Sequence, residues 1–243
     1  MKQVEQVIHA MVNNGGYATL GHLYCNVDIT QWGTKTPFAS IRRIVQDKRH
    51  FFKIRPGLWG LNDYKQEVLA KFDLQNSKTV NDIQIFNHTY YQGLIVEIGN
   101  LKGYETYIPL QDQNKQFLQT PLKNISNLNT IYQFTYPHVV KRASGVDVTW
   151  FNQRKFPNAF FEVEHSTDFQ NSLSKFSDLQ DFNARFFIVS AEKKRSRFEW
   201  IMENYSLYES IKNYVEFVDY DYIAKLHAKT CEIVSLQQEK IAL

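Results

Sequence analysis

Three carboxylate side chains lie in two apolar segments that a short polar break separates. Asp147 belongs to the first segment, residues 146–151, and Glu162 and Glu164 belong to the second, residues 159–165. Both segments are rich in β-branched and aromatic residues, so the pattern predicts two antiparallel strands joined by a turn. Oxygen ligands with no Cys nearby suit a hard divalent cation, Mg²⁺ or Mn²⁺. The stretch therefore indicates a metal site on a β-hairpin.

The geometry of such a hairpin would bring the carboxylates together. A turn at the middle of the polar break places Asp147 opposite Glu162. Strand alternation keeps Glu162 and Glu164 on one face, about 7 Å apart, and turns His165 to the other face, where it is interpreted as structural. A buried, isolated carboxylate costs several kcal/mol, so such a group persists only with a counter-charge. The alternative is a solvated edge strand, which the neighbouring Phe and Val residues disfavour.

The chemistry expected of this group is phosphodiester hydrolysis. That reaction needs an activated water and cations that neutralise the developing charge, and one or two Mg²⁺ ions supply both. Asp147 would bridge metals and Glu162 would complete the shell, with the backbone carbonyl of Val163 as a further ligand. Glu164 would bind metal or accept a proton from the water. Lys175 is a candidate source of positive charge if its helix packs against the site, and otherwise a solvated lysine.

Apolar periodicity predicts the elements that must position these groups. A long helix is expected over residues 80–100, a second helix over 169–181 and a buried strand over 185–190. With the hairpin, these elements predict a mixed sheet flanked by helices, an α+β or α/β fold. Glu97 lies within the apolar stripe of the long helix, where a lone Glu is usually only a boundary residue. Residues 111–140, rich in Gln and Asn, give no clear prediction.

The first quarter of the chain differs from the rest in charge. Residues 1–62 contain eight Lys or Arg against three acids, a net charge of +5, whereas the whole chain carries only +3. A basic module beside a slightly acidic remainder is typical of a DNA-binding region joined to a metal site. Ordinary surface variation would give the same balance.

Apolar spacing within residues 1–62 predicts a small helical module. Helices are expected over 2–13, after Thr19 and over 37–48. Residues 51–61 alternate around a Pro-Gly pair, which predicts a β-hairpin. Three helices followed by a hairpin are the order of a winged helix, whose third helix enters the major groove of DNA.

Candidate DNA contacts follow from this arrangement. The side chains expected to reach base edges are those of Ser40, Arg43 and Gln46. The side chains expected to contact phosphates are those of Lys35, Arg42, Lys53 and Arg55. The alternative is a winged helix that contacts proteins, with its basic residues merely solvated.

The carboxylate pattern resembles that of a known nuclease fold. Asp147, followed on the next strand by Glu162-Val163-Glu164, is similar to the PD-(D/E)xK fold in the Glu-x-Glu form found in some restriction endonucleases. Two departures are Val146, where the family name has Pro, and Glu164, where the motif usually ends in Lys. The resemblance implies that a Glu on the opening helix also binds the metal. In this sequence Glu97 is the matching residue.

Residues 1–62 resemble the HARE-type winged helix-turn-helix domain that is fused to restriction endonucleases, above all in the wing at 51–61. The two resemblances imply an N-terminal winged-helix domain over 1–62, a helical linker over 63–78 and a nuclease domain over 79–243. The implied activity is that of a type II-like restriction endonuclease, which hydrolyses double-stranded DNA at specific sequences with Mg²⁺, for which Mn²⁺ can substitute.

Other functions stay open at this point. One is a different nuclease of the same fold, acting in repair, in mobile elements or on RNA. Another is a non-catalytic DNA-binding regulator with a degenerate nuclease fold. For the restriction enzyme we expect a homodimer, because each polypeptide carries one site and the two DNA strands run in opposite directions. A cognate DNA methyltransferase is expected as its genetic partner.

Composition limits the location of the protein. No run approaches the roughly 20 apolar residues of a membrane span, and the first residues lack a signal-peptide pattern. Cys25 and Cys231 are far apart in the sequence, which suggests neither a zinc knuckle nor a disulfide framework. We therefore expect a cytoplasmic protein with no membrane partner.

Overall fold

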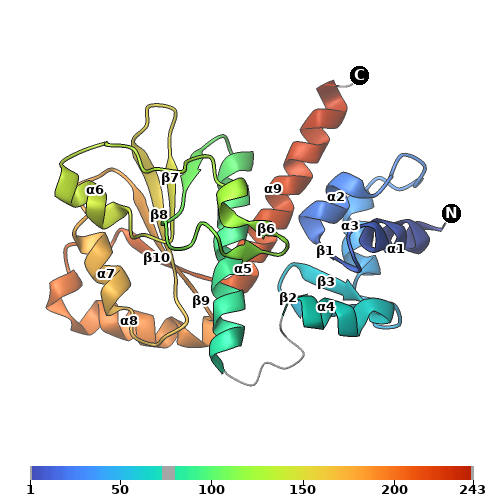
Figure 1. Ribbon diagram of the computed structural model, residues 1–243, viewed down its shortest axis with the longest axis horizontal. Coiled ribbons are helices and arrows are strands. Elements are labelled where there is room, and N and C mark those ends of the chain that lie inside the picture. The colour runs from blue at the N-terminus through green and yellow to red at the C-terminus, as the bar shows by residue number, and fades with distance from the viewer. Residues whose placement is uncertain (1, 73–79, 242–243) are drawn as a thin grey trace. The chain divides into compact units, whose positions relative to one another are not determined.

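A computed structural model describes residues 2–72 and 80–241 (Figure 1). The chain divides into two compact units, one with residues up to Ile83 and from Ala224 onward, the other from Gln84 to Ile223. The sequence-based boundaries at 62 and 78 remain predictions. The part of the expected linker that follows Phe72 lies outside the described residues.

The second unit is built on a five-stranded mixed sheet. Its strand order is β10-β9-β8-β7-β4, with bounds Val215–Asp219, Arg185–Ser190, Pro157–Val163, Val148–Phe151 and Glu105–Tyr107. The β4–β7 and β7–β8 pairs are antiparallel, whereas β8–β9 and β9–β10 are parallel. A mixed sheet flanked by helices is the predicted fold class, and it is confirmed for this part of the chain.

The β7–β8 hairpin has the register that its sequence symmetry predicts. Val148 pairs with Phe161, so Asp147 and Glu162 occupy the next opposed positions. β8 ends before Glu164, whose backbone N–H still donates to a carbonyl of β9 at 2.8 Å. Asp147 therefore lies just before the start of β7 and Glu164 just after the end of β8. Side chains from helices can reach both acids there.

Helices cover both faces of this sheet (Figure 1). The helix α5 (Val80–Leu101) lies on one face, where Trp150 of β7 donates its indole N–H to the Ile95 carbonyl at 3.2 Å. It ends as predicted near Gly103, whose φ of +79° suits a helix C-terminus. On the other face, Phe160, Phe176 and Phe186 pack in one buried core. That face carries α6 (Pro137–Ala143), α7 (Gln170–Ser177) and α8 (Arg195–Asn204).

Shorter elements complete the second unit. The segment 111–140, which the sequence left unassigned, contains the small hairpin of β5 (Gln116–Phe117) and β6 (Thr120–Pro121) and the 3-10 turn η2 (Leu122–Asn124). Two further 3-10 turns are η3 (Glu192–Lys194) and η4 (Ser206–Tyr208).

The small hairpin approaches α5 at a glycine. A Cβ atom at Gly93 would lie 2.1 Å from Cδ2 of Phe117, closer than any side-chain contact allows. We expect Gly93→Ala to lower the free energy of unfolding by about 1–2 kcal/mol, because overpacking outweighs the gain in helix propensity. Denaturant unfolding would measure this. Gly145→Ala, whose Cβ would meet only a carbonyl oxygen at 3.6 Å, is the control. A stable Gly93→Ala protein would contradict the close approach.

The first unit begins with helices and a small sheet. Its elements are α1 (Gln3–Asn13), β1 (Tyr17–Thr19), α2 (Leu20–Asn26), α3 (Pro37–Ile44), β2 (Phe51–Arg55), β3 (Leu58–Leu61), η1 (Asn62–Tyr64) and α4 (Lys65–Lys71). The sheet order is β1-β3-β2, antiparallel throughout. Three helices and a hairpin occur in the expected order, and β1 adds a strand that the sequence pattern did not indicate.

Two features of this unit differ from expectation. The third helix ends at Ile44 and not at Lys48, because the next amides bond three residues back in tight turns. The second feature is α9 (Tyr220–Ile241), whose residues from Ala224 onward belong to this unit and contribute Ala228 and Cys231 to its core. Within residues 2–72 and 80–241, no helix combines the length and apolar character that crossing a membrane requires.

Candidate active site

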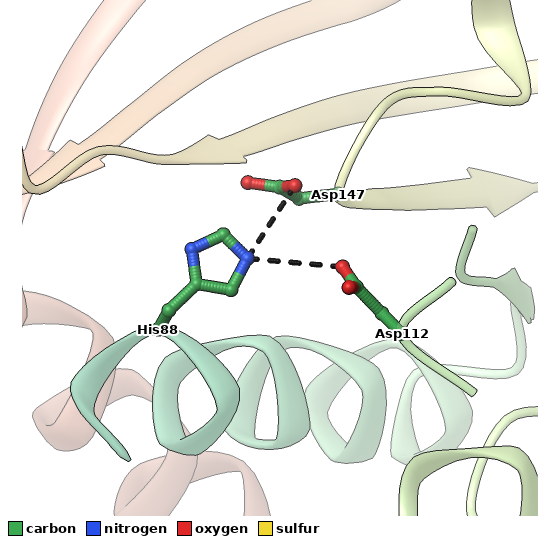
Figure 2. A group of neighbouring side chains, drawn as sticks. All are labelled: His88, Asp112 and Asp147. Carbon is green, nitrogen blue, oxygen red and sulfur yellow. Dashed lines mark ion pairs between the residues drawn. The ribbon is translucent and has the colours of Figure 1, made fainter. Parts of the chain in front are cut away.

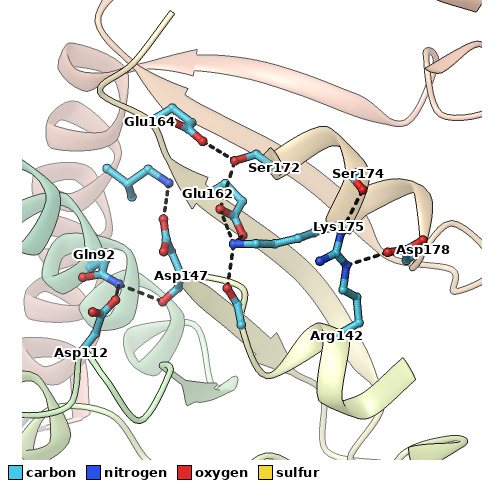
Figure 3. A network of polar contacts seen from close by, with 12 residues as sticks. Gln92, Asp112, Arg142, Asp147, Glu162, Glu164, Ser172, Ser174, Lys175 and Asp178 are labelled. Atoms are coloured by element: carbon cyan, nitrogen blue, oxygen red, sulfur yellow. Dashed lines mark hydrogen bonds and ion pairs between the residues drawn. The ribbon is translucent and has the colours of Figure 1, made fainter. Parts of the chain in front are cut away.

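The three acids predicted on the hairpin lie together in the second unit (Figure 3). Asp147 accepts the backbone N–H of Val163 through Oδ2 at 2.7 Å. The Ser172 hydroxyl lies 3.1 Å from Oε2 of Glu162 and is also hydrogen-bonded to Oε1 of Glu164. Ser172 has one hydroxyl proton for two carboxylates, so the two glutamates compete for it. The structure thus groups the acids and leaves their negative charge only partly satisfied.

A lysine from α7 supplies positive charge to this group. The Nζ atom of Lys175 lies 2.8 and 3.0 Å from the two carboxylate oxygens of Glu162 and 2.7 Å from the carbonyl of Gly145. The helix is held in place by Leu173 and Phe176, which point into the core. Lys175 was expected to reach the site only if its helix packed there, and the structure brings it to Glu162.

Negative charge exceeds what Lys175 neutralises. Burial raises the pKa of Glu162, and the neighbouring charge of Asp147 raises it further, against the opposing effect of Lys175. Burial also raises the pKa of Glu164, although the hydrogen bond from Ser172 opposes this. Carboxylates that repel one another in a buried site are stabilised by a bound cation. The donor set of carboxylate oxygens therefore fits a hard divalent ion.

A histidine from α5 faces the same group (Figure 2). His88 Nδ1 lies 3.0 Å from the carbonyl oxygen of Val163, and its Nε2 lies 3.5 Å from Oδ1 of Asp147 and 3.8 Å from Oδ2 of Asp112. Burial alone would lower the pKa of His88, but Asp112 and Asp147 outweigh it and raise this pKa to about 10. His88 is therefore a half-buried side chain whose protonated form the two carboxylates favour.

Asp112 and Gln92 connect His88 to the surrounding structure. Gln92 lies one turn after His88 on α5, and its Nε2 donates to Oδ2 of Asp112 at 2.8 Å and to the carbonyl of Asp147 at 3.2 Å. Asp112 Oδ1 pairs with Lys115 at 2.5 Å. Burial works against the charged form of Asp112, yet the bonds from His88, Lys115 and Gln92 hold its pKa below the usual range. Asp112 is therefore a buried carboxylate in its charged form.

Sequence reasoning selected a different residue of α5. Glu97 follows His88 by nine residues, which is a rotation of about 180° around the helix axis. The helix therefore turns Glu97 away from the face that carries His88 and Gln92, and a role for Glu97 at the metal remains a prediction. The spacing of His88 and Gln92, four residues apart within an apolar helix, was the available signal for that face. Asp112 follows no periodic pattern that would have indicated it.

His165 lies beside this group but has its own partners. Its Nδ1 is 2.7 Å from the hydroxyl of Tyr220, and its ring centre is 5.8 Å from that of His88. Burial lowers the pKa of His165 to about 4, and the charge of His88 acts in the same direction. His165 is therefore a half-buried side chain whose neutral form is favoured, in keeping with the structural role proposed for it.

The side chains expected to contact DNA belong to the first unit. Those of Lys35, Arg43, Gln46 and Lys53 are exposed, and those of Ser40 and Arg55 are half-buried. Arg42 differs from the expectation: its guanidinium bonds Glu232 of α9 at 2.9 Å and the Tyr24 hydroxyl at 3.0 Å. This pairing engages Nη1 of the guanidinium, and a phosphate contact by Arg42 remains a prediction. The sequence could not indicate the pairing with Glu232, because the two partners are 190 residues apart.

The fold and these contacts define an α+β domain with a partly buried group of carboxylates at the end of its central hairpin. Residues 69–242 match the family model of the C-terminal domain of type II restriction enzyme NmeDI. That match covers most of the chain, and the chain belongs to this family.

One curated relative supports the same relationship. Type II restriction enzyme NmeDI of Neisseria meningitidis serogroup C is 28% identical over 123 residues, which are 45% of this chain and 34% of that enzyme. The chain therefore matches about a third of the length of this relative. No solved structure matches the chain.

Proposed function

We propose that this chain is a type II-like restriction endonuclease that hydrolyses phosphodiester bonds in double-stranded DNA with a divalent cation. The observation that carries the proposal is the group of buried Glu162 and half-buried Asp147 and Glu164 with Lys175 beside it, in a chain of this family. The position of Asp147 opposite Glu162 also supports assignment to the PD-(D/E)xK fold in its Glu-x-Glu form.

The residues of this group would bind the metal, accept a proton and compensate charge. Asp147, Glu162 and the carbonyl of Val163 would hold Mg²⁺ or Mn²⁺. When bound, such a cation neutralises charge on the phosphoryl oxygens and lowers the pKa of a coordinated water. Glu164 accepts hydrogen bonds from Ser172 on Oε1 and from Ser166 on Oε2, the latter at 3.3 Å, and its remaining lone pairs would accept a proton from the water. Its raised pKa makes it a better base. Lys175 orients Glu162 and offsets its charge.

Digestion of unmethylated plasmid DNA tests this function. With Mg²⁺ we expect discrete fragments, and with EDTA we expect none. A smear of fragments would indicate a nuclease without sequence preference. DNA binding without any cleavage, in folded protein with Mg²⁺ or Mn²⁺, would favour the non-catalytic regulator. Either of these last two results would overturn the restriction-enzyme proposal.

We also propose that the first unit reads the DNA sequence as a HARE-type winged helix spanning residues 1–62. The proposal is supported by the order of α1, α2 and α3 followed by the β2–β3 hairpin, and by the net charge of +5. Because α9 contributes Ala228 and Cys231 to the core of this unit, binding should be studied with the full chain and not with residues 1–62 alone.

Two substitutions should separate sequence reading from general affinity. Arg43→Ala is expected to cost about 1–3 kcal/mol of discrimination at one base position, because Arg43 would contact a base edge. Lys53→Ala should weaken binding to all sequences, because Lys53 would contact a phosphate. It should also reduce the slope of log binding constant against log salt concentration by about one. Fluorescence anisotropy at several salt concentrations would measure both.

Arg49→Ala is the matched control, because Arg49 is exposed and paired with Asp47. Equal effects of all three substitutions on every DNA sequence would contradict a base-reading role for Arg43.

We propose a homodimer on DNA, with a cognate methyltransferase as the genetic partner. One site per chain and two antiparallel strands support the dimer. Among aromatic residues of the C-terminal third, Trp200 and Tyr214 are exposed and remain candidates for the interface, whereas Tyr208 is buried in the core. Sedimentation of the protein with its cognate duplex would test the assembly. A monomeric complex that still breaks both strands together would contradict it.

A further inference from the structure

His88, Asp112 and Asp147 form a second group of ligand atoms next to the proposed hydrolytic site (Figure 2). One such atom from each residue lies within 4.8 Å of the other two. His88 Nε2 is 3.5 Å from Oδ1 of Asp147 and 3.8 Å from Oδ2 of Asp112, which is longer than a good hydrogen bond. Ligands about 2.1 Å from one tetrahedral ion are about 3.4 Å from each other. The separations are therefore closer to those of ligands around an ion.

Each of the three side chains is fixed by a hydrogen bond or ion pair through one atom and directs another atom toward the group. Nδ1 of His88 faces the Val163 carbonyl at 3.0 Å, so it carries a proton and Nε2 is the nitrogen available to a metal. Metal-binding histidines usually donate their second N–H in this way. Asp147 Oδ2 is held by a backbone N–H at 2.7 Å, and Asp112 Oδ1 is held by Lys115 at 2.5 Å. The arrangement is that of a preorganised binding site.

Gln92 gives a second, independent sign of a ligand. Its side chain is completely buried, and its Nε2 donates hydrogen bonds to Asp112 and to the backbone carbonyl of Asp147. Within the part of the chain that the structure describes, its Oε1 has no hydrogen-bond partner. A buried amide oxygen is costly to leave unpaired, so it needs a partner such as a water molecule, which a hydrated ion in the group would supply.

We propose that His88 Nε2, Asp112 Oδ2 and Asp147 Oδ1 bind a divalent transition-metal ion, separate from the cation proposed at Glu162. An imidazole nitrogen combined with two carboxylates favours ions such as Mn²⁺ or Zn²⁺ over Mg²⁺, which prefers oxygen ligands. Binding replaces the proton on Nε2. This site depends on the proposed function only because both sites use Asp147. It can bind a metal ion whether or not the chain cleaves DNA.

Electron paramagnetic resonance of Mn²⁺ bound to the full chain tests the proposal. In excess Mg²⁺ we expect one Mn²⁺ per chain to remain bound, with the ¹⁴N hyperfine coupling that an imidazole ligand produces. His88→Gln should remove this coupling and weaken the retained Mn²⁺ at least about tenfold. Asp112→Asn should weaken it similarly. Loss of all Mn²⁺ to Mg²⁺, or a bound ion without ¹⁴N coupling, would overturn the proposal.

Two matched variants sharpen the result. His165→Gln changes the neighbouring histidine, whose Nδ1 is engaged by Tyr220, and should preserve the coupling. Glu162→Gln should abolish DNA cleavage and still retain this Mn²⁺, which distinguishes failure of the hydrolytic site from failure of the second site. Circular dichroism reports whether each variant folds. If His88→Gln does not fold, the wild-type coupling and its survival in His165→Gln decide the question.

Discussion

Asp147→Asn is expected to lower the rate of DNA cleavage by about a thousandfold or more while the chain stays folded. A bound cation contributes several kcal/mol of charge stabilisation, and each 1.36 kcal/mol corresponds to about tenfold in rate. Asn can still accept the Val163 N–H that Asp147 accepts at 2.7 Å, so the hairpin should keep its register. Single-turnover cleavage of plasmid DNA would measure the rate, and circular dichroism would check the fold.

Asp178→Asn is the control for this substitution. Asp178 is an exposed acid that pairs with Arg142 at 2.6 Å, outside the carboxylate group, and its replacement should leave the rate close to that of the wild type. Glu162→Gln should behave like Asp147→Asn, because both carboxylates would hold the same cation. Full activity of Asp147→Asn, or equal wild-type cleavage in EDTA, would rule out the metal mechanism.

Lys175→Met is expected to lower the free energy of unfolding by about 3–5 kcal/mol at pH values above the raised pKa of Glu162, because there it leaves a buried carboxylate without its counter-charge. Glu162 is only 3% exposed, and Lys175 contacts both of its oxygens. Met keeps the length and apolar stem of Lys, so the packing of α7 should change little. Denaturant unfolding at several pH values would measure the loss.

The sign of the pH effect follows from Glu162. Its pKa is already raised in the folded protein, and removal of Lys175 raises it further, so the folded state takes up a proton more readily than the unfolded state. The stability deficit should therefore be smallest at low pH and grow as pH rises past the folded pKa. The double variant Lys175→Met/Glu162→Gln should recover most of the loss. A double variant as unstable as Lys175→Met would contradict the pairing.

The hairpin and its acids could be predicted because local rules determine them. A polar break between two apolar segments sets the register, and the register brings Asp147 opposite Glu162, as observed. Strand alternation then puts Glu162 and Glu164 on one side, where Ser172 contacts both. The parallel strand β9 was also predictable, because a short run of apolar residues without alternation is typical of a buried strand.

The other half of the site depends on tertiary packing. α5 carries apolar residues around much of its circumference, so periodicity does not tell which face meets the sheet, and the sequence pattern pointed to Glu97 without indicating His88. Asp112 reaches the site from an irregular segment, where no apolar periodicity indicates the direction of a side chain. Arg42 was assigned to DNA on its charge alone, whereas its partner Glu232 lies at the far end of the chain. Such pairings exist only after distant segments meet.

The parallel pairing of β8 with β9 determines when the site can form. The connection between these strands contains α7, the helix that carries Lys175, so Glu162 gains its buried counter-charge only once the crossover has closed. Parallel strands pair slowly, because the entropy of closing the connection is lost before any contact compensates for it. A nascent chain on the ribosome would hold these acids hydrated and apart. On the proposed function, the DNA of the host cell would be exposed to a complete cutting site only after the central unit has been synthesised and folded.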